Sequence, residues 1–247
     1  MNSDMDQQLF EGVKCVWIDL DDTLIDFEAN SRASLLWLYQ SQGLDRWFAT
    51  AEQWIDSYEA HNKALWADYA AGCVTRDFLR LDRFSHPFIQ AGVLQEEALE
   101  MSRRFDPLYL DTLAIQKRLI EGALPLLDAL HRCGFSIGVL SNGFTEVQHR
   151  KIKSAGLAGH IDHVVLSDDI GVNKPDVRLY RHAQTVAGIT SPAANLMIGD
   201  NLSTDIQGAL NAGWRAVWFD RHAQAKESEL PKCHHVTRLQ QLTDMLS

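Results

Sequence analysis

The chain has 247 residues, of which 46% are apolar and 23% charged, which suits one large domain or a domain with a sizeable insertion. Its formal net charge of −10 argues against duplex nucleic acid as a partner, although a small anion can still bind where local positive charge overrules the net charge. No apolar run is long enough to span a bilayer, so we expect no membrane partner.

Five apolar runs have the composition of strands that are covered on both faces. They are Lys14–Ile18, Ser136–Leu140, His163–Leu166, Asn195–Ile198 and Ala216–Phe219. Helical patterns lie between them at Ala123–Cys133, Thr145–Ala155, Arg178–Ala187 and Thr204–Ala212, and a glycine follows each one where a left-handed cap is expected: Gly134, Gly156, Gly188 and Gly213. Alternating strands and helices predict the α/β class, with a doubly wound parallel sheet.

More than 110 residues separate the first and second predicted strands, far too many for one crossover connection. We therefore predict an α/β core built from residues 1–26 and 114–247, with an α-helical domain, residues 27–113, inserted after the first strand. The insertion is rich in aromatic side chains, which we interpret mainly as helix–helix core: Trp37, Tyr39, Trp47, Phe48, Trp54, Tyr58, Trp66, Tyr69 and Phe78. Stacking of some of them on a bound base stays open.

The four cysteines are far apart and form no CxxC pair, which indicates reduced thiols: Cys15, Cys73, Cys133 and Cys233. The first eight residues are polar and acidic, unlike a signal peptide, so we expect a cytoplasmic protein. His234 and His235 follow Cys233 directly, but this spacing matches no zinc site and is interpreted as a surface turn.

The first predicted strand ends in Asp19-Leu20-Asp21-Asp22-Thr23, three carboxylates within four residues. Crowded carboxylates at the end of a buried strand repel one another and resist desolvation, so something must compensate them. A divalent cation is the simplest candidate. Three more polar segments are predicted beside the sheet, where open parallel sheets bind ligands: Ser141-Asn142-Gly143, Lys174-Pro175, and Gly199-Asp200 with Asp205 following.

These four segments, in this order, resemble the motifs of the haloacid dehalogenase superfamily: Asp19-x-Asp21-x-Thr23, Ser141-Asn142, Lys174-Pro175 and Gly199-Asp200-Asn201-x-x-x-Asp205. The insertion stands where the helical-cap subfamily I of that superfamily has its cap. The resemblance implies a Rossmann-like core and a Mg²⁺ ion. It also implies that Asp19 is the nucleophile and that Asp21 is the general acid and base.

Further roles follow from the same resemblance. Asp19 and Asp200 would bind Mg²⁺ through their side chains, and Asp21 would bind it through its backbone carbonyl. Asp205 is expected either as an outer ligand or as a partner of Lys174 or of metal-bound water. Lys174 would neutralise Asp19 and reach the phosphate. The phosphoryl oxygens would be bound by Ser141, Asn142, the Gly143 amide and Thr23, with Thr23 mainly orienting the loop, although Ser141 and Asn142 could equally cap the next helix.

Asp21 favours phosphoryl transfer over dehalogenation, because dehalogenases of the superfamily attack carbon and use no acid at this position. Phosphonatases need a lysine in the cap, and Lys63, the only lysine of the insertion, has no feature that marks it for that role. Three segments together resemble the bacterial pyrimidine 5′-nucleotidase branch: Asp21-Asp22-Thr23, Ser141 to Gln148 and Asp168 to Pro175.

We therefore predict a Mg²⁺-dependent phosphatase, acting through an aspartyl phosphate on a small-molecule phosphate ester such as a nucleoside 5′-monophosphate. The protein is expected as a monomer or homodimer. A cap that opens and closes would have hinges near residues 25–28 and 113–121. Two alternatives stay open: a sugar phosphomutase, which a bisphosphate activator would reveal, and a non-catalytic phosphate-binding protein of the same fold.

Overall fold

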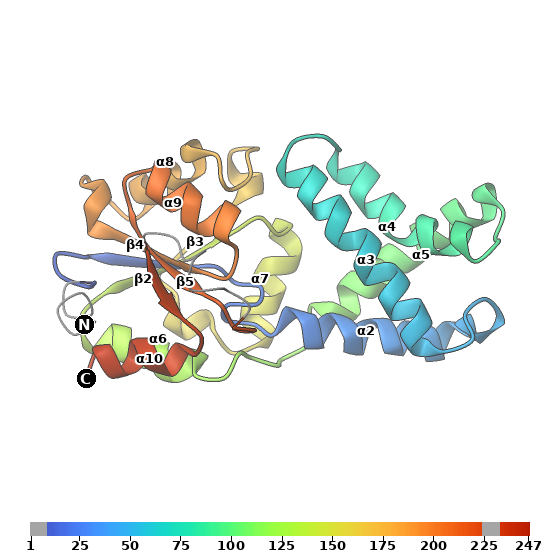
Figure 1. The fold of residues 1–247 in the computed structure, drawn as a ribbon, viewed down its shortest axis with the longest axis horizontal. Coiled ribbons are helices and arrows are strands. Elements are labelled where there is room, and N and C mark those ends of the chain that lie inside the picture. Colours follow the sequence, from blue (N-terminus) through green and yellow to red (C-terminus); the bar gives the residue numbers. More distant parts are fainter. Residues whose placement is uncertain (1–8, 224–232) are drawn as a thin grey trace. The chain divides into compact units, whose positions relative to one another are not determined.

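The computed structural model describes residues 9–223 and 233–247. The chain divides into two compact units, one from Met1–Phe27 with Lys117–Ser247 and one from Glu28–Gln116 (Figure 1). The first unit contains a six-stranded sheet and the second is helical. No described helix has the length and apolarity needed to cross a membrane.

The sheet of the first unit has the strand order β3-β2-β1-β4-β5-β6, and every neighbouring pair is parallel. Its strands are β1 (Cys15–Ile18), β2 (Ser136–Ser141), β3 (His163–Leu166), β4 (Asn195–Gly199), β5 (Arg215–Phe219) and β6 (His234–Val236). The predicted class, an α/β fold with a doubly wound parallel sheet, is confirmed.

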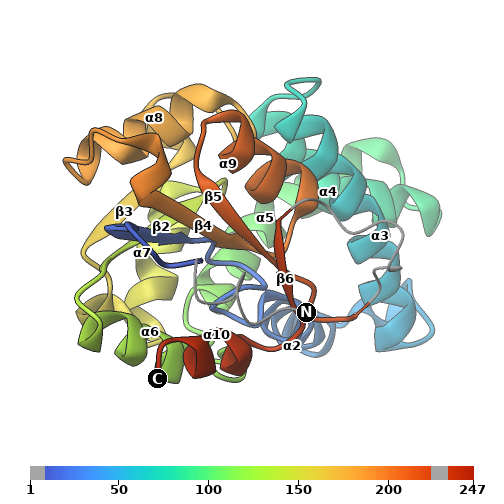
Figure 2. The ribbon, with the colours of Figure 1, turned by 60° about the vertical axis from the view of Figure 1, so that its left-hand side comes forward.

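Helices cover both faces of this sheet, as Figure 2 shows. On one face lie α6 (Ala123–Arg132), α7 (Thr145–Ser154) and α10 (Leu239–Met245), and on the other lie α8 (Val177–Val186) and α9 (Gln207–Asn211). The side chains of β1 alternate between the two apolar cores: Val16 and Ile18 enter the first, and Cys15 and Trp17 enter the second. Burial on both faces explains why the strands are apolar almost without interruption.

The five predicted strands are present with bounds shifted by at most one residue, and the four expected glycine caps have left-handed φ angles. Strand β6 and helix α10 were not predicted. The interpretation of residues 233–235 as a turn is wrong, because His234 and His235 belong to β6 and pair with β5. A strand of three residues with two histidines, at the edge of a sheet, has no apolar run that could reveal it.

The second unit consists of four longer helices: α2 (Phe27–Gln42), of which all but the first residue lies in this unit, α3 (Ala51–Ala70), α4 (Arg76–Gln90) and α5 (Gln95–Leu113). Threonine side chains cap the amino-terminal ends of two of these helices. Thr50 accepts a hydrogen bond from the Gln53 amide at α3, and Thr75 accepts one from the Phe78 amide at α4. Each cap satisfies a backbone donor that the helix itself leaves unpaired.

The apolar core of this unit is an aromatic cluster, joined by ring contacts between α3, α4 and α5: Phe48, Trp54, Tyr58, Phe84, Phe88, Phe105 and Tyr109. Of the nine aromatics that the sequence analysis singled out, only Phe48, Trp54 and Tyr58 are buried in it. Trp37 and Phe78 are exposed, at 42% and 48% of their surface, so the prediction of core is wrong for these two.

A buried ion-pair network joins α4 to α5 inside this unit. Asp106 accepts hydrogen bonds from Arg83 Nε at 2.9 Å and from Arg80 Nε at 2.8 Å, and both Arg83 and Asp106 are buried. Burial opposes the charge of Arg83, but the neighbouring Tyr58 and Asp106 outweigh it, so the pKa of Arg83 is raised. Arg83 therefore stays charged and depends on Asp106 as its partner.

We expect Asp106→Ala to destabilise the protein by roughly 3–5 kcal/mol, because it leaves the buried guanidinium of Arg83 without its carboxylate. Asp56→Ala is the matched control, since the Asp56 side chain is 68% exposed and lies 3.6 Å from Arg32. Removal of such a surface pair changes stability by less than about 1 kcal/mol. Urea unfolding followed by circular dichroism measures both variants, and equal midpoints for the two would contradict the expectation.

Candidate active site

The polar segments predicted to meet do lie at one edge of the sheet. Asp19 follows β1 directly, Asp200 follows β4 directly, and Ser141 is the last residue of β2. Strand β1 is hydrogen-bonded to both β2 and β4, so the three residues stand at the carboxyl ends of adjacent parallel strands. The chain order along the sheet reverses at β1, which is where open α/β sheets place their ligands.

Lys174 is the centre of the side-chain cluster at this edge. Its ammonium Nζ lies 2.5 Å from Asp19 Oδ1 and 2.6 Å from Asp205 Oδ1, and it donates to the Leu140 carbonyl at 2.9 Å. Lys174, Asp19 and Asp205 are all buried. Three short contacts from a buried ammonium fix its position and screen the two carboxylates from each other.

The cluster holds more negative than positive charge. Burial raises the pKa of Asp19 to about 7, against the attraction of Lys174. Burial, followed by repulsion from Asp205, raises the pKa of Asp200 well above its usual value. Burial works against the charge of Lys174, but Asp19 and Asp205 outweigh it and raise the pKa of the lysine. The single positive charge of Lys174 thus faces three carboxylates, and it does not balance their combined negative charge.

The donor set fits a hard divalent cation. One carboxylate oxygen from each of Asp19, Asp200 and Asp205 lies within 4.8 Å of the others. Within the described part of the chain, the Asp200 carboxylate has no hydrogen bond or ion pair of its own. Asp205, by contrast, is bound to Lys174 and accepts from the Asn201 amide at 3.0 Å. Asp19 and Asp200 therefore have oxygens to offer to Mg²⁺, whereas Asp205 is held in a supporting position.

The backbone after β4 is shaped around Asp205. A π-helical turn, η5 (Leu202–Ile206), stands where one continuous helix from Thr204 was predicted, and α9 begins only after it. A Cβ atom at Gly199 would overlap the Asp205 carboxylate, so only glycine lets the two approach. π-Helical turns of this kind are frequent at functional sites.

Asp21 is held by two residues of α7 that the sequence analysis did not single out as site residues. Gln148 Nε2 donates to Asp21 Oδ2 at 2.9 Å and to Ser141 Oγ at 2.8 Å, and Lys151 forms an ion pair with Asp21 Oδ1. Gln148 and Lys151 are both buried. Their spacing of three places them on one face of α7, but no motif in that helix marks Asp21 as their target.

The segment predicted to bind phosphate is also tied to its neighbours. Both polar groups of the Asn142 side chain bond to the backbone of Lys174, at 2.7 and 3.1 Å. Ser141 Oγ accepts from the Gly143 amide at 3.2 Å. A Cβ at Gly143 would overlap Gln148, which explains the glycine by packing within the protein. Asn142 thus positions the lysine, and its contact with phosphate stays a prediction.

Thr23 and Asp22 differ in their surroundings. The Thr23 side chain is fully buried, and its hydroxyl finds no hydrogen-bond partner within residues 9–223 and 233–247. Its predicted role in orienting the loop or binding phosphate stays a prediction. Asp22 has a left-handed φ of 59° and pairs with Arg221 at 2.7 Å, so its carboxylate is already engaged by a guanidinium.

Two curated relatives resemble the chain along nearly its whole length. It is 32% identical to the pyrimidine 5′-nucleotidase PynA of Streptococcus pneumoniae, with 94% of each chain covered. It is 30% identical to the pyrimidine 5′-nucleotidase YjjG of Escherichia coli, with 94% of this chain and 96% of the relative covered. The resemblance to the bacterial pyrimidine 5′-nucleotidases is confirmed, and so is the predicted enzyme class, a phosphoric monoester hydrolase.

Among solved structures, a HAD-hydrolase described as putative, YfnB of Bacillus subtilis bound to magnesium, superimposes with a TM-score of 0.82 at 25% identity. The superposition covers 95% of this chain and 98% of that one. Residues 13–213, which include all four predicted motifs, match the haloacid dehalogenase-like hydrolases. On this match, the parallel sheet and the two relatives, the chain belongs to the family of haloacid dehalogenase-like hydrolases.

Proposed function

We propose that this hydrolase is a Mg²⁺-dependent phosphatase that cleaves small phosphomonoesters, with nucleoside 5′-monophosphates as its leading substrate class. The observation that carries the proposal is the buried bridge of Lys174 between Asp19 and Asp205. It holds one carboxylate ready at the end of the central strand, while the Asp200 carboxylate lies beside it with no hydrogen bond or ion pair to any described residue. The similarity to pyrimidine 5′-nucleotidases supports the substrate class.

In the first step a carboxylate oxygen of Asp19 attacks phosphorus, and the bond from phosphorus to the ester oxygen breaks. Protonated Asp21 gives its proton to the leaving oxygen, and an aspartyl phosphate remains on Asp19. Lys174 attracts the negative charge that reaches the phosphoryl oxygens, from a position that its three contacts already fix. Mg²⁺ held by Asp19, Asp200 and the Asp21 carbonyl would reduce the repulsion between the attacking carboxylate and the phosphate.

In the second step Asp21, now ionised, takes a proton from water, and the hydroxyl oxygen attacks phosphorus and releases Asp19. Both Asp21 oxygens are engaged, one with Gln148 and one with Lys151. Asp21 must therefore exchange one of these partners for the substrate oxygen or the water. The two partners of α7 keep the carboxylate at a defined place between the two steps.

Release of inorganic phosphate tests the proposed function directly. We expect turnover of nucleoside monophosphates that needs added Mg²⁺ and is abolished by chelation. A panel should include pyrimidine and purine nucleotides, sugar phosphates and phosphorylated acids. A preference for sugar phosphates would overturn the substrate class but leave the phosphatase chemistry standing, whereas no turnover on any ester would overturn both.

The remaining proposals concern the role of the helical unit, the location of the protein in the cell and its oligomeric state. We propose that the unit Glu28–Gln116 serves as the cap, which admits the substrate and excludes bulk water. The four cysteines are free thiols, which supports a reducing, cytoplasmic location. A monomer or a homodimer remains the proposed assembly.

Lys151→Met should lower kcat by about 10- to 100-fold, because the Asp21 carboxylate loses the cation that holds it in position. KM should change much less, since the proposed phosphate ligands are untouched. Steady-state kinetics on the best nucleotide separates the two constants. Lys151→Arg should regain part of kcat by restoring the charge.

Lys153→Met is the matched control on the same helix, since Lys153 is exposed and lies two residues further along α7. It should keep the wild-type kcat. Equal kcat values for Lys151→Met and Lys153→Met would show that the Asp21–Lys151 pair plays no part in turnover.

A further inference from the structure

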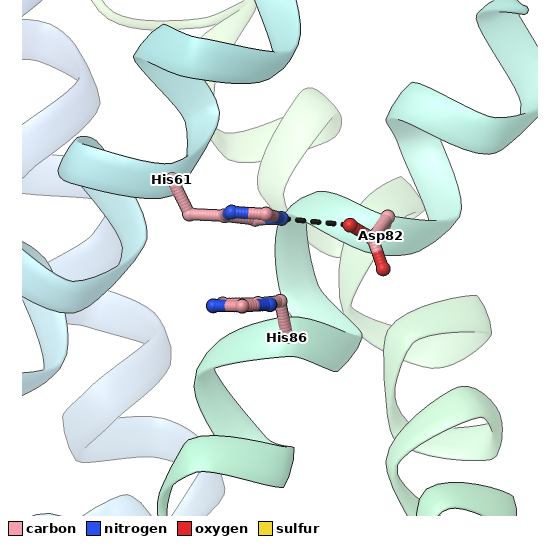
Figure 3. Close-up of side chains that lie close together, drawn as sticks. All are labelled: His61, Asp82 and His86. Carbon is pink, nitrogen blue, oxygen red and sulfur yellow. Dashed lines mark hydrogen bonds and ion pairs between the residues drawn. The ribbon is translucent and has the colours of Figure 1, made fainter. Parts of the chain in front are cut away.

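Two groups of potential metal ligands occur among the described residues. One is the group of Asp19, Asp200 and Asp205 at the candidate active site, called the Asp19 cluster below, and the other lies outside it. It consists of His61 on α3 with Asp82 and His86 on α4, all within the helical unit (Figure 3). Asp82 and His86 are four residues apart and therefore share one face of α4. His61 reaches toward that face from the neighbouring helix, as the close-up shows.

The three side chains are already close to one another. His61 Nε2 lies 2.7 Å from Asp82 Oδ2, and the His61 and His86 rings are stacked with centroids 3.8 Å apart and an angle of 10° between their planes. One ligand atom from each residue lies within 4.8 Å of the other two. All three are half-buried, so water and ions from solvent can reach them.

The charge state of the group also favours a cation. Partial burial, together with the nearby His61 ring, lowers the pKa of His86 against the attraction of Asp82. An imidazole in its neutral form offers a nitrogen lone pair that can bind a metal ion. Two imidazoles in face-to-face contact cannot both be protonated without repulsion, and the Asp82 carboxylate adds a negative charge beside them.

We propose that His61, Asp82 and His86 form a binding site for a first-row transition-metal dication, with Zn²⁺ as the representative ion. Two imidazole nitrogens and one carboxylate oxygen are ligands that suit such ions, whereas Mg²⁺ prefers oxygen alone. Three protein ligands leave the remaining positions to water, as in an open zinc site.

Binding requires a local change in the rings but not in the helices. A metal lies in the plane of each imidazole that holds it, so the two stacked rings must turn about their side-chain torsions until their lone pairs meet. His61 Nε2 must also lose its proton before it can bind the metal. If the ring is neutral, the proton moves to Nδ1 of the same ring, and if the ring is charged, the proton is released to solvent. The metal then links α3 to α4 and stabilises the folded helical unit.

Zinc binding by the purified, metal-stripped enzyme tests the proposal. In millimolar Mg²⁺, which competes for the Asp19 cluster, the wild type should retain one Zn²⁺ more than the double variant His61→Gln/His86→Gln after dialysis. Asp82→Asn should weaken zinc binding at this site by at least about 10-fold, because even the loss of a residue that only supports a metal ligand typically costs that much affinity. Titration calorimetry and metal analysis measure these values.

A second histidine pair supplies the matched control. The His131 and His160 rings are stacked at 6.3 Å and have their own carboxylate neighbours in Asp162 and Asp128, but they do not bring three ligand atoms together. The double variant His131→Gln/His160→Gln should retain as much zinc as the wild type. Loss of one Zn²⁺ from this control with none lost from His61→Gln/His86→Gln would overturn the assignment.

The wild type alone also gives an answer, whatever the variants do to folding. Co²⁺ bound by two nitrogens, one carboxylate and water should produce a visible absorption band, which Zn²⁺ abolishes by displacement but excess Mg²⁺ does not. The midpoint of thermal unfolding should rise with Zn²⁺ in the wild type. No cobalt band, or equal zinc content in the wild type and His61→Gln/His86→Gln, would mean that the three side chains only pack α3 against α4.

Discussion

Asp19→Asn is expected to lower phosphate release by at least about 10⁴-fold, the scale of loss seen when a nucleophile is removed from an enzyme that works through a covalent intermediate. The amide has nearly the same shape as the carboxylate, but it is a far weaker nucleophile and a poorer metal ligand. Lys174 keeps its contacts with Asp205 and the Leu140 carbonyl, so the buried lysine still has partners. The variant should therefore fold and yet be inactive.

The intermediate gives a second readout of the same substitution. Acid quenching of the wild type during turnover of a labelled ester should trap phosphate on the protein in a form that hydroxylamine releases, as expected for an acyl phosphate. Asp19→Asn should trap none. A trapped phosphate of equal amount in the variant would place the nucleophile on another residue.

Asp22→Asn is the matched control within the same acidic segment. Asp22 pairs with Arg221 and has a left-handed φ that asparagine also tolerates, so the substitution changes charge without distorting the turn. We expect activity close to that of the wild type. A loss as large as that of Asp19→Asn would mean that the segment responds to its total charge and that Asp19 has no special role.

Lys174→Met is expected to damage both stability and catalysis. It leaves Asp19 and Asp205 buried without their shared cation, and the loss of one partner from a buried ion pair typically costs roughly 3–5 kcal/mol. Turnover should fall by about 10²- to 10³-fold or more, since a fixed positive charge no longer faces the phosphoryl oxygens. Urea unfolding and steady-state kinetics measure the two losses separately.

The stability loss should depend on pH in a defined direction. Burial holds the pKa of Asp19 near 7 in the metal-free protein, above its ordinary value of 3.8. An acid whose pKa is raised by folding destabilises the folded state as pH rises through that window. Lys174 lowers the pKa of Asp19, so without the lysine the window extends higher. Metal-free Lys174→Met should therefore lose more stability at neutral pH than in mild acid.

A double variant separates the two losses. Lys174→Met/Asp205→Asn removes one positive and one negative charge together, so it should be more stable than Lys174→Met alone. Its activity should stay low, because Asp19 still lacks the lysine. If activity returned along with stability, Lys174 would be needed only to neutralise Asp205 and not for the transfer of phosphate.

The sheet could be predicted well because its signals are local. Each of the runs ending at Ile18, Leu140 and Ile198 is apolar on both faces, and a glycine or a polar segment follows it. Strand β6 was not predicted, because it has only three residues, two of which are histidines, and lies at the edge of the sheet. Likewise, the π-helical turn Leu202–Ile206 was not predicted, because a helical pattern does not distinguish such a turn from a continuous α-helix.

Some features of the candidate site also have a local sequence signal, whereas others depend on contacts between distant segments. The sequence alone could propose Asp19, Asp21, Lys174 and Asp200 as site residues, because their motifs follow recognisable strands or loops in a set order, and their roles stay predictions. The partners of Asp21 were not, since Lys151 is 130 residues away from it in the chain and α7 carries no motif that names its target. Contact of Asn142 with phosphate stays a prediction, whereas the bonds of its side chain to the backbone of Lys174 became visible only in the structure.

The amino-acid sequence by itself determined the alternation of strands and helices and the carboxylates at the strand ends, because these follow from short-range periodicity and from chemistry within a few residues. The tertiary structure alone decided which charges meet. Lys174 bridges Asp19 and Asp205, Lys151 holds Asp21, and two helices bring His61 beside Asp82 and His86. Such pairings depend on the packing of segments distant in the chain, and no local pattern specifies them.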